Sequence, residues 1–425
     1  MRVFHAADLH LDSPFRGLAQ VSERVAARLR EASLRTLDRL AAEARRAGVD
    51  AVLLAGDTHD SADRSVRAQI RLRDALVGLA HDGIPSYVVL GNHDPADGWA
   101  LDLAQPGVHV FPPGRPGGCD VVVEGRCIGH VDGISYPTAV VRDNYARRLR
   151  RRDDSPASVA LLHANVGGAA TGHADYAPAR MEDLTSSGHD YWALGHVHTR
   201  QVLRRSAPAV VYPGNPQGRS MREPGVRGAY VAEVEDGRLA ELSFVPLCDV
   251  VFERVGVEAA GASAGDLADL LLSRLAALRS EGEGEARVVR LEVEGEADAS
   301  VAQLLAVPER RRDLLGVLRE EAEARWLAGE ALVWPEGVVD RSRRRRLEPP
   351  PGTLLADVLD LARAAAAEDE AGAELRREAR NALAPLFDHP ALRALAPAAD
   401  DAALTAWLAA AADRLARALG EEEGA

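Results

Sequence analysis

Five short polar clusters in the first 200 residues carry side chains that could bind metal ions and move protons. Each cluster lies at the end of a short apolar run of the kind that forms a buried strand. The clusters are Asp8-Leu9-His10, Gly56-Asp57-Thr58-His59-Asp60, Gly91-Asn92-His93-Asp94, His163 and Gly195-His196-Val197-His198. Because loops at the carboxyl ends of strands in an open α/β sheet converge on one crevice, we expect all five clusters to meet there.

The donor atoms of these clusters indicate a particular kind of metal site. Carboxylate oxygens, an amide oxygen and imidazole nitrogens, without thiolates, suit manganese, iron or zinc better than copper or a structural zinc site. One bridging carboxylate and several imidazoles can hold two divalent ions about 3.5 to 4 Å apart, which clamps the attacking and leaving oxygens of a phosphate ester. The adjoining glycines allow the tight turns and close approach that such ligands need. The sequence therefore predicts a two-metal site for phosphate ester hydrolysis.

The ordered pattern DxH, GDxxD, GNHD, H and GHxH resembles the calcineurin-like metallophosphoesterases over roughly the first 250 residues. Within that superfamily, three segments resemble the YhaO-type DNA repair exonucleases, which are related to the SbcD nuclease subunit. These segments are residues 7–18 (ADLHLDSPFRGL), 63–69 (DRSVRAQ) and 212–219 (YPGNPQGR).

This resemblance implies a role for nine of the side chains. Asp8, His10 and His198 would hold one metal ion, Asn92, His163 and His196 the other, and Asp57 would bridge the two. His93 is not a ligand in the family, and it would stabilise the transition state or protonate the leaving oxygen. Asp60 would orient His93, since a carboxylate behind an imidazole fixes its tautomer and basicity.

Four further residues are candidates for substrate binding. His59 departs from related nucleases, which usually have an aromatic or apolar residue there, so it is either a second phosphate contact or a residue that supports the site. Arg16, Arg219 and Arg222 lie in loops that the resemblance places near the metal crevice. Arginine forks there could hold a nucleic-acid backbone, although surface arginines without a role are common.

The spacing of apolar residues predicts an α/β fold. Strands are expected at residues 2–7, 51–55, 85–90, 158–163 and 191–194, with a helix over 22–47 and short strands from 108 and over 201–245. Residues 250–340 read as strand, helix, strand and helix. With the resemblance, this indicates a layered metallophosphoesterase sandwich of two mixed β-sheets flanked by helices, a small α/β cap and a C-terminal helical region.

Four segments are therefore expected along the chain. They are a metallophosphoesterase domain at 1–248, a cap domain at 249–340, an Arg/Pro-rich linker at 341–352 and a helical region at 353–425. The last segment has amphipathic helical spacing, with Leu354, Leu355, Val358, Leu361, Leu404, Trp407, Leu408, Ala411, Leu415 and Leu419 on apolar faces. Resemblance to the SbcD group suggests that this region docks onto an SMC-like ATPase, either SbcC-like or YhaN-like. The resemblance is also compatible with a homodimer.

Composition restricts the class of protein. Three cysteines in no CxxC spacing fit a reducing cytoplasm, and no window approaches 18 consecutive apolar residues, so we expect a cytoplasmic protein without membrane segments. The net charge of −14 argues against coating of nucleic acid by charge alone. The acidity lies mainly beyond residue 250, where 22 arginines face 34 acidic residues. Arginine runs at 147–152 and 341–346 could bind DNA phosphates, or could be solvated surface and linker.

The leading hypothesis is a DNA phosphodiesterase with two divalent ions, most favourably Mn²⁺. The resemblance implies 3′-to-5′ exonuclease activity in repair or end processing, with endonuclease activity on single strands as an addition. One alternative is a metallophosphoesterase that acts on a phosphate ester other than DNA. Another is a subunit that only recruits the ATPase, which the full set of ligands and His93 disfavours. A protein phosphatase is disfavoured because Ser61 and Ala62 follow Asp60 where Arg-Gly would be required.

Overall fold

The protein is described here from a computed structural model. The described residues are 1–344 except Pro14, 16–22, Arg64, 99–100, 153–154, 168–175 and 282–285, followed by 352–353, 356–357, 360–361, 364–365, 370–387, 404–405, 407 and 411. The chain divides into two compact units, Met1–Arg343 and Arg344–Ala425. Arg16 and most of the expected C-terminal apolar faces lie outside the described residues.

The first β-sheet has six strands in the order β12-β11-β1-β2-β3-β4. The strands are β1 (Arg2–Ala6), β2 (Ala51–Ala55), β3 (Ser86–Val89), β4 (Val108–Val110), β11 (Gly228–Glu235) and β12 (Arg238–Pro246). Strands β1 to β4 are parallel, whereas β11 pairs antiparallel with both β1 and β12. The sheet is therefore mixed, with its parallel part running from β1 to the edge strand β4.

The second β-sheet also has six strands, in the order β5-β6-β7-β8-β10-β9. The strands are β5 (Gly117–Val123), β6 (Arg126–Ile134), β7 (Ser158–His163), β8 (Tyr191–Gly195), β9 (Gln201–Arg204) and β10 (Ala209–Tyr212). Its four central strands are parallel and its two edge strands are antiparallel to them. The predicted pair of mixed sheets is thus confirmed.

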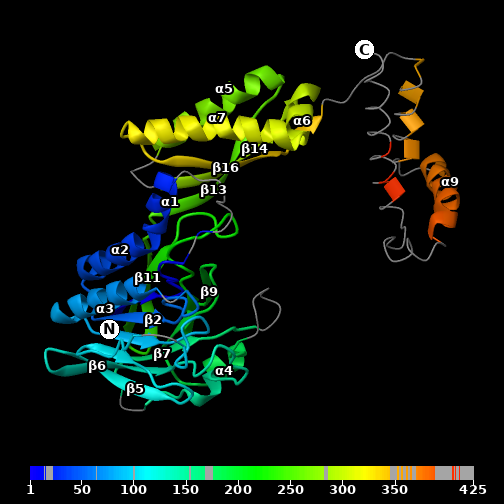
Figure 1. Ribbon diagram of the computed structural model, residues 1–425. Helices are drawn as coiled ribbons and strands as arrows, with labels where there is room; N and C mark the ends of the chain where they lie inside the picture. Colours follow the sequence, from blue (N-terminus) through cyan, green and yellow to red (C-terminus); the bar gives the residue numbers. More distant parts are fainter. Residues whose placement is uncertain are drawn as a thin grey trace. The chain divides into compact units, whose positions relative to one another are not determined.

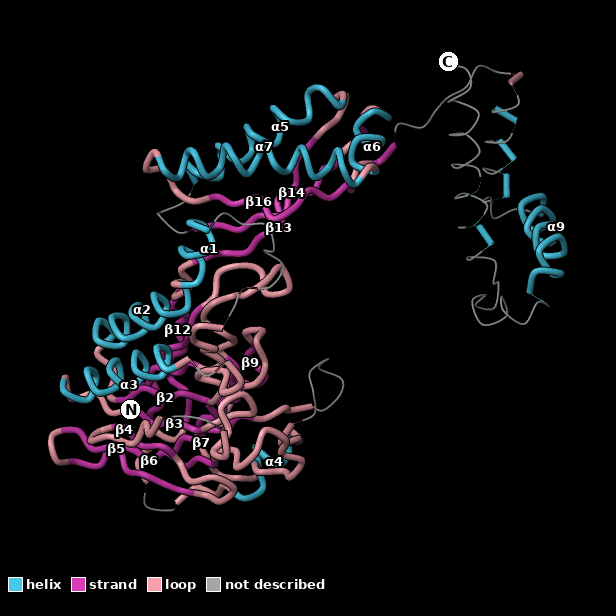
Figure 2. The backbone as a smooth tube through the Cα atoms, viewed as in Figure 1, coloured by secondary structure: helices cyan, strands magenta, loops and turns pink. Residues whose placement is uncertain are grey.

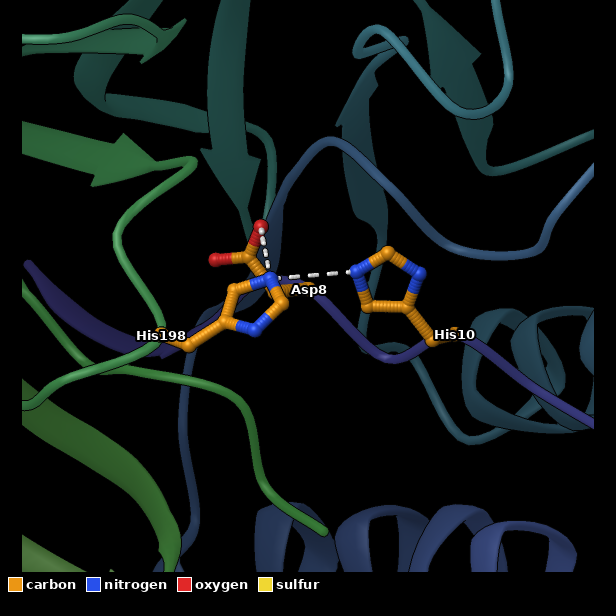
Figure 3. Close-up of side chains that lie close together, drawn as sticks. All are labelled: Asp8, His10 and His198. Carbon is orange, nitrogen blue, oxygen red and sulfur yellow. Dashed lines mark hydrogen bonds and ion pairs between the residues drawn. The ribbon is translucent and has the colours of Figure 1, made fainter. Parts of the chain in front are cut away.

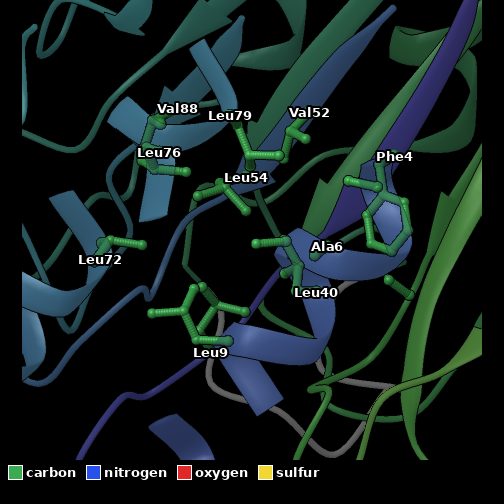
Figure 4. Close-up of a cluster of buried hydrophobic side chains, with 14 of the residues drawn as sticks. Phe4, Ala6, Leu9, Leu40, Val52, Leu54, Leu72, Leu76, Leu79 and Val88 are labelled. Carbon is green, nitrogen blue, oxygen red and sulfur yellow. The ribbon is translucent and has the colours of Figure 1, made fainter. Parts of the chain in front are cut away.

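Strands β1, β2 and β3 of the first sheet are almost entirely buried because both faces of the sheet are covered there. Val3 and Leu53 point into the core between the two sheets, while Phe4 and Leu54 point toward the helices α2 (Ala32–Ala47) and α3 (Val66–His81). Figure 4 shows side chains of α3 among those of the strands, and Figures 1 and 2 show both helices along one side of this sheet. On the second sheet, the short helix α4 (Met181–Thr185) covers the outer face.

The single helix expected over 22–47 is two helices, so this prediction was wrong in detail. Helix α1 (Glu23–Arg30) ends before Glu31, and α2 begins at Ala32. The break has a packing reason: Val25 and Leu29 of α1 belong to a core shared with the third sheet, whereas the apolar face of α2 packs on the first sheet. One straight helix could not place both apolar faces on these different surfaces.

The third sheet follows at residue 250 and is parallel throughout. It contains β13 (Val250–Glu258), β14 (Ala286–Glu294) and β16 (Val333–Asp340), and it is covered by α5 (Ala264–Glu281), α6 (Ala299–Ala306) and α7 (Pro308–Leu327). Strands β15 (Glu296–Ala297) and β17 (Arg343–Arg344) form a separate two-stranded sheet. Helix α6 and strand β16 were not expected from the sequence. The expected domain boundary at residue 248 falls inside the first compact unit and stays a prediction.

The second compact unit contains helix α9 (Glu370–Phe387). This helix lies within the segment for which the sequence predicts helices. No helix in the described part of the chain combines the length and the apolar composition that crossing a lipid bilayer requires.

Candidate metal centre

Strand ends from both six-stranded sheets bring the polar clusters together. Asp8 follows β1, Asp57 follows β2, and His163 is the last residue of β7. Side-chain atoms that could ligate a metal ion lie within 4.8 Å of one another in three overlapping groups. The groups are Asp8, His10 and His198; Asp8, Asp57 and His163; and His10, Asp60 and His93. The expected convergence of the five clusters at one site is therefore what the structure has.

The backbone that carries this site is strained. Asp8, His10, Asp57 and His196 all have positive φ, at 53°, 42°, 51° and 101°, although none of them is glycine. Non-glycine residues rarely adopt this region, and its cost is of the order of 1 kcal/mol per residue. Hydrogen bonds from Asp8 N to Gly56 O and from His10 N to Asp57 O, both 3.0 Å, help to hold the turns. Residues with such strained backbone conformations cluster at active sites and ligand-binding sites.

Two glycines let the ligand-bearing turns come this close. A Cβ on Gly91 would collide with Asp57 Oδ1, and a Cβ on Gly195 would collide with the carbonyl oxygen of Ala55. Both contacts involve atoms that the site itself fixes in place. The role expected for the glycines is therefore specific to these positions, where any side chain would push two strand ends apart.

Three imidazoles are oriented by partners behind them. The Nδ1 atoms lie 3.3 Å from Asp60 Oδ1 for His10, 2.9 Å from Ala55 O for His163 and 2.7 Å from Glu223 Oε1 for His198. Each partner atom is an acceptor, so each Nδ1 carries the proton that it donates. In the neutral ring Nε2 is then an acceptor. The three rings thus present acceptor atoms toward the centre of the site.

The Nε2 atoms meet one another and two carboxylates. His10 Nε2 lies 3.2 Å from His198 Nε2, and Figure 3 shows the His198 ring between His10 and the Asp8 carboxylate. Asp57 Oδ2 lies 3.4 Å from His163 Nε2 and 3.8 Å from His10 Nε2. One oxygen of Asp57 therefore faces two separate imidazole groups, which is the placement that a bridging ligand needs.

An amide oxygen completes the side of the site next to His163. The Oδ1 atom of Asn92 lies 3.0 Å from His163 Nε2. Because His163 Nδ1 is committed to Ala55 O, this contact joins two acceptor atoms. The imidazole ring of His196 lies beside that of His163, with centroids 5.1 Å apart. Asn92 and His196 thus both lie next to His163, although His196 belongs to none of the three groups of potential ligand atoms found among the described residues.

Burial decides the protonation of this cluster. Burial raises the pKa of Asp57 to about 7, with repulsion from Asp94 as the next cause. Burial also raises the pKa of Asp8 well above its usual value. The same burial lowers the pKa of His10 to about 3 and that of His163 to about 4, so these rings are neutral. Buried carboxylates, an amide oxygen and neutral imidazoles form the donor set that divalent manganese, iron or zinc prefers.

His93 lies at the edge of the cluster, next to Asp60. Its Nδ1 forms a short ion pair with Asp60 Oδ1, and its side chain is 47% exposed. The hydrogen bond to Asp60 raises the pKa of His93 to about 9, so the ring is protonated at neutral pH. Asp60 also accepts hydrogen bonds from His10 Nδ1 and from Ser13 Oγ. A single carboxylate therefore orients both a candidate ligand and a candidate acid.

Sequence reasoning assigned no role to Asp94, although it ends the GNHD motif. Its carboxylate accepts hydrogen bonds from the backbone N–H groups of Asp57, Thr58 and Gly91, at 3.1, 2.7 and 2.6 Å, and from the Thr58 hydroxyl. It ties the turn after β2 to the turn after β3. Ser13 was missed as well, because its contact to Asp60 spans 47 residues and has no local signature.

The candidate substrate residues differ in position. Arg219 is near the site, with Nη1 3.7 Å from Asp60 Oδ2 and 22% of its side chain exposed. Arg222 is exposed in the same loop. His59 is only 2% exposed, with Nδ1 next to the Thr58 hydroxyl, so its burial favours the supporting role over phosphate contact. Arg16 is outside the described residues.

Comparison with known proteins agrees with the family that the motifs of the sequence resemble. The family model described as calcineurin-like phosphoesterase matches residues 1–200. The chain is 36% identical over 362 residues to a Bacillus subtilis protein named uncharacterized metallophosphoesterase YhaO, covering 83% of this chain and 86% of that one. It is 26% identical over 269 residues to the SbcD component of the nuclease SbcCD from B. subtilis, covering 53% of this chain and 64% of that one. It is 27% identical over 272 residues to the DNA double-strand break repair protein Mre11 of Methanopyrus kandleri, covering 58% and 56%.

Proposed function

Since the chain belongs to the calcineurin-like metallophosphoesterase family, we propose that it is a metal-dependent DNA phosphodiesterase, acting as a 3′-to-5′ exonuclease in DNA repair or end processing. The observation that supports catalysis is the convergence of buried carboxylates and inward-facing Nε2 atoms beside the protonated His93. The choice of DNA is supported by similarity to two proteins whose names denote a nuclease and a DNA break repair protein.

The site is proposed to hold two divalent ions, with Mn²⁺ the favoured metal. One ion would be held by Asp8, His10 and His198, the other by Asn92, His163 and His196, with Asp57 shared between them. When bound, two such ions neutralise charge on the phosphate and lower the pKa of water to the neutral range. The remaining chemistry falls to side chains of the protein.

His93 is proposed as the general acid. Its Nδ1 is committed to Asp60, which leaves the proton on Nε2 for transfer to the leaving oxygen of the scissile ester. Asp60 stabilises the cationic ring and fixes its direction, because the carboxylate is itself held by Ser13 and His10. The proton is returned to His93 from water after the product leaves.

A direct comparison of substrates tests this proposal. Purified chain with Mn²⁺ would be incubated with labelled single-stranded, duplex and hairpin DNAs, beside bis-p-nitrophenyl phosphate and p-nitrophenyl phosphate. We expect Mn²⁺-dependent shortening of DNA from the 3′ end and hydrolysis of the diester. Hydrolysis of the monoester alone would favour the alternative, a metallophosphoesterase that acts on another phosphate ester. Binding of DNA or of an ATPase without hydrolysis of any ester would favour a protein that only recruits the ATPase.

Arg219→Ala is expected to weaken DNA binding more than catalysis. The guanidinium lies beside Asp60 and is partly exposed, so it is placed to contact a phosphate next to the scissile one. Loss of one charged hydrogen bond should raise KM for DNA about tenfold, with kcat changed far less. Arg238→Ala, an exposed arginine on β12, is the matched control. Equal KM values for wild type and Arg219→Ala would remove Arg219 from substrate binding.

Truncation after Arg346 tests whether the C-terminal region binds the proposed ATPase partner. The first compact unit ends at Arg343, so the truncated chain retains all of that unit and its core. Hydrolysis of bis-p-nitrophenyl phosphate should stay within about twofold of wild type, while co-purification with an SMC-like ATPase is lost, as expected for helices that dock into a partner groove. Unfolding or loss of metal in the truncated chain would instead place these helices in the enzyme's own structure.

A further inference from the structure

Glu223 occupies a central position in the loop between β10 and β11. Its Oε1 lies 2.7 Å from His198 Nδ1. Its Oε2 accepts hydrogen bonds from Asn215 Nδ2 at 3.1 Å and from the backbone N–H of Arg219 at 2.8 Å. The carboxylate therefore spans from the loop backbone to the rear of the His198 ring, and its side chain is only 15% exposed.

The loop that carries Glu223 is itself fixed to the His198 segment. Arg227 donates from Nη1 to His198 O at 2.7 Å and from Nε to Glu223 O at 2.9 Å. The same guanidinium also donates to Asn215 Oδ1. Asn215 thus has its amide oxygen on Arg227 and its amide nitrogen on Glu223. These bonds leave the Glu223 carboxylate little freedom to move away from His198.

A second anchor ties the loop to the third sheet. Gln217 Oε1 accepts hydrogen bonds from Asp249 N at 2.9 Å and from Val250 N at 3.1 Å, and Gln217 Nε2 donates to Val250 O at 2.8 Å. The Gln217 side chain is 2% exposed. The loop is thus held at one end by the start of β13 and at the other by the His198 segment, with Glu223 between the two anchors.

We propose that Glu223 is a positioning residue of the metal centre, which holds His198 in the Nδ1–H tautomer with Nε2 directed toward Asp8 and His10. The inference rests on the proposed function, because His198 acts as a ligand only if the site binds metal. A histidine without a rear acceptor exchanges between two tautomers and two ring orientations, and only one combination presents an Nε2 lone pair to the ion. The Glu223 carboxylate fixes one tautomer and one ring orientation of His198 before the ion binds.

Glu223→Gln tests the proposal at constant size. The glutamine side chain has one acceptor oxygen and one NH₂ group, whereas all three groups facing Glu223 are donors. In either orientation the NH₂ group must face a donor, so the contact with His198 or the anchor to the loop is lost. Loss of such an outer carboxylate typically weakens metal binding by about 10- to 100-fold.

The measurement is Mn²⁺ affinity by isothermal titration of the full-length chain, with Co²⁺ absorption as a second readout of ligand geometry. Glu223→Gln should bind Mn²⁺ about 10- to 100-fold more weakly and alter the Co²⁺ spectrum, while its thermal unfolding midpoint without metal stays near that of wild type. Glu241→Gln, an exposed glutamate on β12, should match wild type in all three measurements. If Glu223→Gln does not fold, Glu223→Asp, which keeps the charge but is one methylene shorter, gives the same comparison.

The outcomes separate this inference from the proposed function. If wild type binds Mn²⁺, and the folded Glu223 variant binds it with the same affinity and the same Co²⁺ spectrum, the positioning role is overturned and the proposed function stays intact. Wild type that binds no divalent ion would overturn both. A weakened and spectrally altered variant, with wild-type stability, supports the positioning role.

Discussion

Asp57→Asn is expected to reduce hydrolysis to background and to lower the metal content of the protein. Asp57 Oδ2 faces His163 Nε2 and His10 Nε2, so its negative charge contributes to both proposed ions at once. Its other oxygen accepts the backbone N–H of His93 at 2.9 Å. An asparagine would keep its oxygen on that N–H and turn its NH₂ group toward the ions, where a donor repels a cation.

The Asp57 prediction is checked by elemental analysis of metal beside the rate on bis-p-nitrophenyl phosphate. Asp97→Asn, an exposed carboxylate two residues beyond the GNHD turn and its proline, serves as the matched control and should behave as wild type. The unfolding midpoint of each variant shows that the comparison is between folded proteins. Full activity of Asp57→Asn with two bound metals would end the two-metal account.

His93→Ala is also expected to lose turnover, but, unlike Asp57→Asn, to retain its metal. The Nδ1 atom of His93 pairs with Asp60, which leaves the proposed ligands in place, and the backbone N–H that supports Asp57 remains in alanine. Removal of a general acid typically lowers kcat by about 10²- to 10⁴-fold. The loss should be larger for DNA, whose leaving alkoxide needs a proton, than for a p-nitrophenyl ester, whose leaving group is stable as an anion.

Kinetics and metal content together decide the role of His93. His81→Ala, at the exposed end of α3, controls for the loss of a surface histidine. Loss of metal from His93→Ala would make it a ligand. Unchanged turnover would remove it from catalysis, and an equal loss on both substrates would indicate charge stabilisation in place of proton transfer.

The sequence predicted the strands that carry the site because their apolar runs are short and continuous. Strands β2 and β7 span the predicted residues, β1 and β8 differ by one residue at one end, and β3 is one residue shorter at each end. Such runs identify buried strands, and the polar residue that ends each one identifies the functional edge. The fold class and the convergence of the five clusters could therefore be predicted from the sequence alone.

Contacts between distant residues could not be predicted in the same way. Glu223 reaches His198 across 25 residues through a loop whose path depends on Gln217 and β13. The break at Glu31 depends on which core receives Val25, and that core includes Phe252 from the third sheet. Periodicity reports which face of an element is apolar, but it does not report which partner covers that face.

The most direct test of the central claim is the release of labelled nucleotide from the 3′ end of DNA as Mn²⁺ is titrated into metal-free wild type and Asp57→Asn. The account predicts release that rises with Mn²⁺ in wild type, stops with a chelator and stays at background in the variant. Wild type that releases no nucleotide at any Mn²⁺ concentration, or an Asp57→Asn variant that matches it, would contradict the assignment of this site as a metal-dependent DNA phosphodiesterase.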